Sequence, residues 1–255
     1  MNTHLDLSNL SIPGLGFELS TYCRLISAVA RNGVAIVISS PTRSGKTTTA
    51  AALVGEIERR AIIEPGQLPP VTKDQIDGHT LDLVQPDLDA NQLVILTITA
   101  NSIVDTVLRL KASGWLKIIG PRSTTILHQR LVRTVCLGCK KRLLGSDQLL
   151  RLMGVSDEYL ERIQLPLVSS DRPFSSCFGS GCENCMGTGL ATSKGVYEVC
   201  ADAKFHQQDL HFAATRLGYR FESWPIGFAL RDSALTKVLL GVIPLTEANR
   251  VNSEP

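Results

Sequence analysis

The sequence predicts an α/β protein in which helices flank a parallel sheet, with a small cysteine-rich segment and a helical region towards the C-terminus. The continuous apolar run Val34–Ile38 and the mostly apolar segment Leu93–Thr99 are typical of strands that are buried on both faces. Each run is followed by a stretch with helical periodicity, and this alternation favours a parallel sheet. Two C-x-x-C pairs later in the chain predict a metal-binding segment.

The individual elements follow from periodicity and from the positions of glycine and proline. Apolar residues at three- and four-residue steps predict a helix over residues 17–31, which Gly33 ends. Residues 64–80 are rich in proline and glycine and are predicted to be irregular. The remaining predictions are helices from about Lys46 to Arg60, over Ile103–Lys111 and over Thr125–Val135, short helical segments over residues 147–163, a loop over residues 165–189, a short strand over Gly195–Val199, and closing helices over residues 231–240 and 245–252.

Composition narrows the function classes. The 255 residues are 44% hydrophobic and 20% charged, which is ordinary for one large globular domain or two small ones. The net charge is only +2 and aromatic residues make up 5%, so no nucleic-acid partner is predicted. Residues 1–10 do not resemble a signal peptide, and the longest apolar runs are far below the roughly 20 residues of a membrane helix. We therefore expect a cytoplasmic protein.

A phosphate-binding loop is predicted between the first strand and the helix after it. The segment Ser44-Gly45-Lys46-Thr47 fits the end of the G-x-x-x-x-G-K-[ST] pattern. Loop amides and a helix N-terminus offer N–H donors to phosphate, Lys46 would reach the β- and γ-phosphates, and the Thr47 hydroxyl would bind Mg²⁺. The alternative is a chance match in an ordinary turn. The predicted nucleotide-binding residues are Ser40, Thr42, Arg43, Ser44, Gly45, Lys46, Thr47 and Thr48.

One position of this loop departs from the pattern. Ser40 stands where the pattern has its first glycine. If the backbone there needs a positive φ, the serine would strain it by about 1–3 kcal/mol.

The cysteines point to a metal rather than to disulfides. The chain has seven cysteines, and an odd number without a secretion signal argues against a disulfide framework. Four of them, Cys136, Cys139, Cys182 and Cys185, form the two C-x-x-C pairs and would complete a tetrahedral structural Zn²⁺ site. The alternative is four free thiols. Cys177 is a rival ligand with a less suitable spacing, whereas Cys23 and Cys200 are expected to be small core residues.

Read together, these motifs resemble the ATPases that drive type II secretion and type IV pilus assembly. The similarity runs from about residue 11 to residue 251. It is carried by Pro41–Thr49, which matches P-T-G-S-G-K-T-T-T except for Arg43 in place of glycine, by Leu93–Ile98, by Gln129–Arg133 before the first cysteine pair, by Gly181–Cys185, and by Leu230–Gly241. The resemblance implies a shortened RecA-like P-loop NTPase fold with ATP, Mg²⁺ and Zn²⁺ as cofactors. The implied segments are a reduced nucleotide-binding core at 1–135, a zinc-binding segment at 136–200 and a helical region at 201–255.

The chain departs from this family in the acidic half of its active centre. Between Lys46 and Leu93 the chain is a few dozen residues shorter than the family pattern, and Asp74 falls where the family has its catalytic glutamate. The family's T-L-H-T-N-D motif reads Thr97–Ser102 here and has lost its histidine and aspartate. Among polar site candidates only Asn101 and the Gln129-Arg130 pair remain, with Arg130 as the other catalytic candidate, and ordinary helix-cap or surface roles are an equal alternative for them. Val54–Ile57 repeats the family's V-G-E-I letters but falls inside the helix after the loop, so it is interpreted as a decoy.

The residues that the chain has kept and lost distinguish between three functions. A working motor needs the acidic residues that the chain lacks, because phosphoryl transfer depends on an oriented water and on metal ligands beyond Thr47. A zinc-ribbon nucleic-acid binder is disfavoured by the composition. We therefore predict an ATP-binding relative whose hydrolysis is weak or lost, or alternatively a non-hydrolysing structural or regulatory subunit that assembles with an intact ATPase. The resemblance implies a homo- or hetero-hexamer with secretion ATPase subunits, and inner-membrane platform proteins as partners, at the cytoplasmic face of that membrane.

Overall fold

The chain forms two compact units. The computed structural model describes residues 12–31, 33–63, 71–76, 93–119, 122–144, 175–203, 226–228 and 230–253. The first unit comprises residues 1–131, 195–230 and 255, and the second comprises residues 132–194 and 231–254. Strands β4 (Ser123–Val135) and β7 (Leu190–Ala203) contribute residues to both units. The three segments inferred from the sequence stay a prediction.

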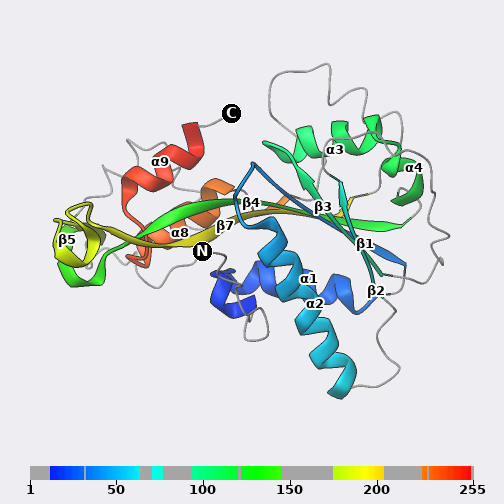
Figure 1. The fold of residues 1–255 in the computed structure, drawn as a ribbon, viewed down its shortest axis with the longest axis horizontal. Coiled ribbons are helices and arrows are strands. Elements are labelled where there is room, and N and C mark those ends of the chain that lie inside the picture. The colour runs from blue at the N-terminus through cyan, green and yellow to red at the C-terminus, as the bar shows by residue number, and fades with distance from the viewer. Residues whose placement is uncertain are drawn as a thin grey trace, which may run out of the picture. The chain divides into compact units, whose positions relative to one another are not determined.

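A mixed sheet lies at the centre of the first unit (Figure 1). Its strand order is β2-β3-β1-β4-β7-β8, so β3 lies between β1 and β2 although it follows both in the chain. β1 pairs in parallel with β3 and β4, and β2 pairs in parallel with β3. β7 and β8 are antiparallel, so the predicted parallel sheet is confirmed for β1 to β4 and not for the whole. The bounds are Val34–Ser40 for β1, Val71–Ile76 for β2, Leu93–Thr99 for β3 and Ile226–Phe228 for β8.

Helices cover both faces of this sheet, as an α/β fold requires (Figure 1). Alternate residues of β1 divide between the two layers: Ile36 and Ile38 pack with α1 and α2, whereas Ala35 and Val37 pack with α3 and α4. All of β1 is buried, which explains its continuous apolar sequence. The helices are α1 (Leu19–Val29), α2 (Lys46–Ile63), α3 (Ile103–Ala112) and α4 (Trp115–Ile119), and a 3-10 turn precedes them at Ile12–Leu15. Within the described ranges no helix combines the length and the apolar character needed to cross a bilayer.

Two of the predicted elements are wrong in type. Thr125–Val135, predicted as a helix, is part of strand β4. Residues 124–130 are all buried. A strand that is covered on both faces shows no alternation of apolar and polar residues, and the apolar spacing of this one also fits a helix. Residues 71–76, predicted as irregular, form the edge strand β2. Pro69 and Pro70, which argue against a strand because proline has no N–H group, come before the first residue of β2. They therefore remove no donor from the hydrogen-bond ladder of that strand.

The predicted burial of the two isolated cysteines is half correct. Cys200 is buried in the core with α3 and α4, as expected. Cys23 is exposed, so that prediction is wrong. The buried side of α1 passes through Thr21, Leu25 and Ala28, and Cys23 lies off this helical stripe.

The second unit contains a pair of short antiparallel strands. β5 pairs with β6 from Lys140 opposite Gly179 to Leu144 opposite Ser175. Glu247 of α9 accepts a hydrogen bond of 2.8 Å from the Arg133 backbone N–H and one of 2.9 Å from Arg250. The predicted closing helices are confirmed, whereas the predicted helical segments at 147–163 lie outside the described residues. The elements are β5 (Lys140–Leu144), β6 (Ser175–Gly179), α8 (Leu230–Leu239), α9 (Leu245–Ser253) and the 3-10 turns η3 (Leu137–Cys139) and η4 (Glu183–Cys185).

Candidate functional site

The predicted phosphate loop has the strand–loop–helix form that anion binding needs. β1 ends at Ser40, residues 41–45 form the turn, and α2 begins at Lys46. The backbone N–H of Thr49 donates to the Gly45 carbonyl at 3.0 Å, which starts the helix directly at the loop. A helix N-terminus leaves its first N–H groups unpaired and carries partial positive charge. The corner is therefore built as the sequence indicated, and ligand contacts of its residues stay a prediction.

Lys46 has a partner that sequence reasoning missed. Its Nζ donates to the Thr99 Oγ1 at 2.9 Å. Thr99 is the last residue of β3 and pairs in register with Ser40, so both strands end beside the loop. The missed signal is topological: the carboxyl ends of neighbouring parallel strands meet at one edge of a sheet, where ligands bind in open α/β folds. Lys46 is partly buried and Thr47 is exposed, so both side chains remain accessible at this edge.

The backbone strain in this loop falls at Arg43. Ser40 lies within β1 and has no positive φ, so the strain considered for it does not arise. Arg43 has φ 59° and Gly45 has φ 79°. The left-handed region suits glycine, whereas other residues adopt it at a cost of roughly 1–2 kcal/mol. The arginine that replaces the family's glycine is therefore the strained residue.

Replacing Arg43 by glycine is expected to stabilise the protein by about 1 kcal/mol, because glycine adopts the left-handed backbone without strain. Urea denaturation of both proteins measures the free energy of unfolding. Thr42→Gly is the matched control, since Thr42 is also exposed and has no positive φ, and there the added glycine should destabilise. An Arg43→Gly protein that loses stability as the control does would contradict the assignment.

Three consecutive side chains of β4 hold the loops at this edge of the sheet. The Gln129 Nε2 donates to the Ser44 carbonyl oxygen in the phosphate loop. On the other face, the Arg130 Nη2 donates to the Asn101 carbonyl at 2.9 Å, in the turn that follows β3. His128 lies on that face too, and its Nδ1 is 2.9 Å from the Ser39 Oγ. β4 therefore contacts both loops, and a catalytic role for Arg130 stays a prediction.

His128 is held neutral by its surroundings. It is fully buried, and burial, with a smaller contribution from the positive charge of Arg130, lowers its pKa from 6.5 to about 4. Asp105 and a hydrogen bond with the Asn101 backbone oppose the shift without cancelling it. In a neutral ring, Nδ1 can either accept a hydrogen bond from the Ser39 Oγ or donate one to it, depending on the tautomer.

Acid should therefore destabilise the fold through His128. Above pH 6.5 the imidazole is mostly neutral in both the folded and the unfolded chain. Below pH 6.5 the imidazole of the unfolded chain binds a proton, whereas that of the folded chain stays neutral until the pH approaches 4, so the unfolded state is favoured. Between pH 6.5 and pH 5 the loss amounts to about 2 kcal/mol. Urea denaturation at pH 7 and pH 5 tests this, with His128→Asn as the comparison. The variant should lose about 2 kcal/mol less over that interval, and equal losses would contradict the account.

The remaining catalytic candidates lie as follows. Asp74 is in β2, where it pairs with Leu96, and Leu96 in turn pairs with Val37. Asp74 is thus level with a residue three positions before Ser40, and its catalytic role stays a prediction. The V-G-E-I segment lies inside α2, as the decoy interpretation requires. Glu56 accepts hydrogen bonds there from Tyr22 at 3.3 Å and from Arg59 at 2.8 Å.

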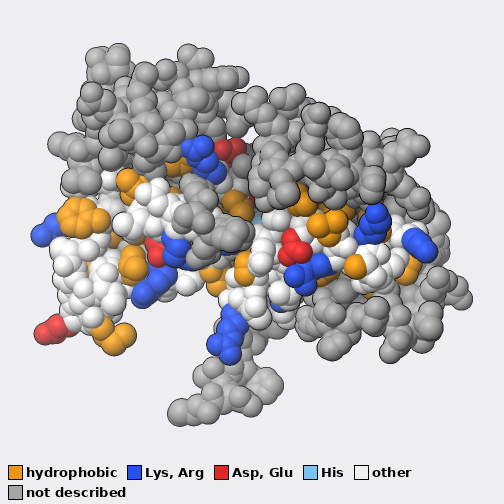
Figure 2. All heavy atoms as spheres, turned by 90° about the horizontal axis from the view of Figure 1, so that it is seen from above, with side chains coloured by type: hydrophobic (Ala, Val, Ile, Leu, Met, Phe, Trp, Pro, Cys, Tyr) orange, Lys and Arg blue, Asp and Glu red, His pale blue; other side chains and the backbone are white. Residues whose placement is uncertain are grey.

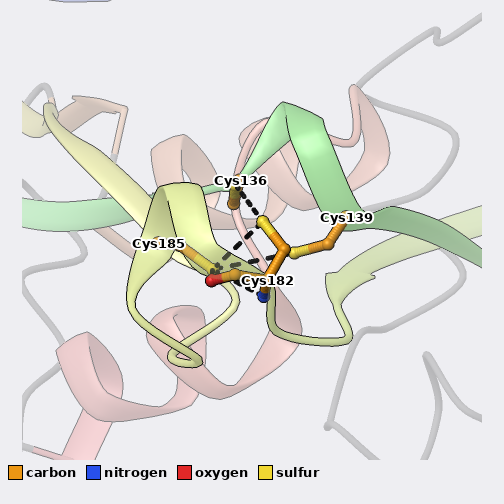
Figure 3. Close-up of side chains that lie close together, drawn as sticks. All are labelled: Cys136, Cys139, Cys182 and Cys185. Atoms are coloured by element: carbon orange, nitrogen blue, oxygen red, sulfur yellow. Dashed lines mark hydrogen bonds between the residues drawn. The ribbon is translucent and has the colours of Figure 1, made fainter.

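The four cysteines of the two C-x-x-C pairs come together in the second unit (Figure 3). Their Sγ atoms all lie within 4.8 Å of one another. The Cys136–Cys182 and Cys139–Cys185 sulfurs are each 3.8 Å apart, and the Cys182–Cys185 sulfurs are 3.7 Å apart. Four thiolates at about 2.3 Å around one tetrahedral ion would lie about 3.8 Å from each other. The cluster can therefore hold a metal ion, and Cys177 does not belong to it.

Backbone groups prepare this cluster for thiolate chemistry. The N–H groups of Cys182 and Gly189 each donate to the Cys185 Sγ at 3.2 Å. Burial opposes ionisation of Cys185, yet these donors and the neighbouring thiols lower its pKa to about 6. At Cys139, burial raises the pKa to about 12. The two N–H donors thus favour the thiolate form of Cys185, which is the form that binds a cation.

The loop that carries the second cysteine pair depends on a close backbone approach. A Cβ on Gly189 would lie 2.2 Å from the Gly179 carbonyl oxygen, and a Cβ on Gly179 would lie 2.0 Å from that of Gly189. Only glycine allows this approach, which lets the Gly189 carbonyl accept a 2.9 Å hydrogen bond from the Cys136 N–H. The glycines that made the segment look like a loop therefore bring the two cysteine pairs together.

Basic side chains do not gather into one patch on the face in Figure 2. Lys and Arg residues of the described chain stand apart there, among acidic and hydrophobic side chains.

The fold and the loop define the class of this protein: a layered α/β protein with a phosphate-loop corner, joined to a four-cysteine cluster. A family model for Type II/IV secretion system proteins matches residues 77–250 of the 255, and the chain belongs to this family. The phosphate loop precedes the matched residues.

Individual relatives agree with this assignment. The chain is 28% identical to the type IV pilus assembly ATPase PilB of Acinetobacter baylyi, over 70% of this chain and 29% of that protein. It is 24% identical to type II secretion system protein E of Aeromonas hydrophila, over 98% of this chain and 55% of that protein. The chain thus spans about half or less of these relatives. The Legionella pneumophila ATPase DotB has a similar fold, with a TM-score of 0.50 and 12% identity over 96% of this chain and 66% of that one.

Proposed function

We propose that this chain binds ATP with Mg²⁺ at the corner between β1 and α2. The observation that carries the proposal is the position of Lys46, which is the first residue of α2 and reaches the end of β3 at Thr99. An ammonium group at a helix N-terminus suits the β- and γ-phosphates, and the exposed Thr47 hydroxyl one residue later suits Mg²⁺. Ser40, Thr42, Arg43, Ser44, Gly45 and Thr48 complete the proposed nucleotide site.

We propose further that hydrolysis is weak or lost. Asp74, in the place of the family's catalytic glutamate, is level with a residue three positions before Ser40, which is about 10 Å along a strand. Thr99 stands where the family has histidine, and a hydroxyl does not substitute for an imidazole base. The Arg130 guanidinium donates to the Asn101 carbonyl, which supports a structural role for that candidate.

For the second unit we propose a structural Zn²⁺ ion on Cys136, Cys139, Cys182 and Cys185. The sulfur spacings support a tetrahedral ion, and four thiolates leave no open position for catalysis. Such an ion would stabilise a segment with little apolar side chain of its own.

The family relationship supports a place in a type II secretion or type IV pilus system. We propose a homo- or hetero-hexamer with secretion ATPase subunits, recruited to inner-membrane platform proteins from the cytoplasmic side. The alternative is a non-hydrolysing structural or regulatory subunit that assembles with an intact ATPase, which the loss of the family's histidine and glutamate favours.

Two measurements on the purified chain test these proposals. Isothermal titration calorimetry with ATP and Mg²⁺ should show saturable binding, and phosphate release under the same conditions should stay near the background rate. Steady release of phosphate that requires Lys46 would identify a working motor instead. A chain that binds no nucleotide would leave only the purely structural alternative.

A further inference from the structure

We propose that Gln129 is a positioning residue that fixes the peptide unit between Ser44 and Gly45, so that the Gly45 N–H is presented to phosphate. The inference rests on the proposed nucleotide site, because it assigns a role in that site to a residue outside the loop. The geometry itself needs no nucleotide, which allows the two proposals to be tested separately.

The contact between Gln129 and the loop is direct and buried. Gln129 lies in β4 beside β1, is only 1% exposed, and donates from its Nε2 to the Ser44 carbonyl oxygen. The same Nε2 is 3.5 Å from the position that a Cβ on Gly45 would take, and the Leu131 side chain is 3.8 Å from it. The side chain therefore fills the space beneath the loop, and Gly45 is the residue against which it packs.

Peptide geometry converts this contact into an orientation of the donor. The Ser44 carbonyl and the Gly45 N–H belong to one planar trans peptide unit, so they point in opposite directions. Holding the carbonyl on Gln129 turns the Gly45 N–H away from Gln129, towards the opposite side of the loop. A phosphate loop works by presenting such N–H groups to the anion, and Gln129 thereby sets the direction of one of them.

The loop needs this restraint because the backbone of Gly45 does not supply one. Gly45 has φ 79°, and glycine adopts positive and negative φ about equally readily, so the residue itself does not fix the orientation of the peptide before it. Rotation of the Ser44–Gly45 peptide changes ψ of Ser44 and φ of Gly45, and it would turn the Gly45 N–H out of place. The hydrogen bond from Gln129 opposes that rotation.

The second observation is the other atom of the Gln129 amide. Its Oε1 is buried and has no hydrogen-bond partner among the described residues. A buried amide with one unpaired atom destabilises a fold, so folding alone does not account for glutamine at this position. Its contact with the loop does.

Hydrogen–deuterium exchange of the nucleotide-free full chain tests the restraint. In Gln129→Met, which keeps the side-chain length and loses the donor, amides of residues 42–47 should exchange about tenfold faster. The matched control is Thr125→Val, which loses a hydroxyl that is buried and without a partner among the described residues, on the same strand; loop exchange should not change.

Unchanged loop exchange in Gln129→Met, or an equal acceleration in Thr125→Val, would overturn the proposal. Gln129→Leu also loses the donor and stays apolar in this buried position, so it should behave like Gln129→Met and serves if the methionine variant does not fold. ATP binding is measured on the same proteins, and Gln129→Met should weaken it about five- to tenfold. Failure of the unaltered chain to bind ATP would refute the proposed function, and the exchange result would still decide the role of Gln129.

Discussion

Replacing Cys185 by serine is expected to remove zinc from the protein and to unfold the cysteine-bearing part of its second unit. Cys185 is buried and receives N–H bonds from Cys182 and Gly189, so its loss removes a sulfur ligand that the backbone holds in place. Structural zinc sites supply much of the folding free energy of the segments that bind them. The purified native chain should contain about one zinc ion per molecule by mass spectrometry. The variant should contain almost none and should melt on the order of 10 °C lower.

Cys177→Ser is the matched control for this experiment. Cys177 is also a buried thiol of the second unit and lies outside the cluster, so the control should keep its zinc. Removal of the metal from the native chain by a chelator should reproduce the lower melting temperature. A native chain purified without zinc, or a Cys185→Ser protein with the native zinc content, would refute the metal site.

Replacing Lys46 by alanine should weaken ATP binding by about a hundredfold or more. The substitution removes the ammonium group that lies at the end of β3, and charge-assisted bonds to phosphate are among the strongest that a side chain makes. A hundredfold loss corresponds to about 2.7 kcal/mol. Titration with a fluorescent ATP analogue in the presence of Mg²⁺ measures it.

Thr99→Val is the control that separates charge from geometry. It removes the partner of Lys46 and keeps the ammonium group, so ATP affinity should change by less than about threefold. A Lys46→Ala protein that binds ATP as the native chain does would show that the nucleotide, if bound, lies elsewhere.

The parts of the fold that the sequence predicted are those in which one local signal decides the outcome. The continuous apolar run of β1 and the glycine and lysine after it determine the phosphate-loop corner, because a buried strand and a helix start leave little choice between them. The spacing of the cysteine pairs likewise predicted which sulfurs meet. β4 was missed because both of its faces are buried, which erases the alternation that marks a strand.

The missed parts of the candidate site depend on contacts between distant segments. Thr99 and Lys46 are 53 residues apart in the chain, and Gln129 is 85 residues from Ser44. No spacing rule connects such residues, and only the strand order brings them to one edge. The sequence shows Arg43 in place of a glycine and makes strain at Ser40 conditional on a positive φ there. The φ angles of a loop are not fixed by its sequence, so only the structure locates the strain at Arg43.

The insertion of β3 between β1 and β2 constrains how the chain can fold during synthesis. Within the described sheet, β2 has β3 as its neighbour, and β1 has β3 and β4. A nascent chain that has emerged only as far as Ile76 therefore holds two strands that have no ladder to form with each other. The sheet starts to assemble only when Leu93–Thr99 leaves the ribosome and docks between them. Shielding of the apolar side chains of β1 by a chaperone should therefore matter most before that point.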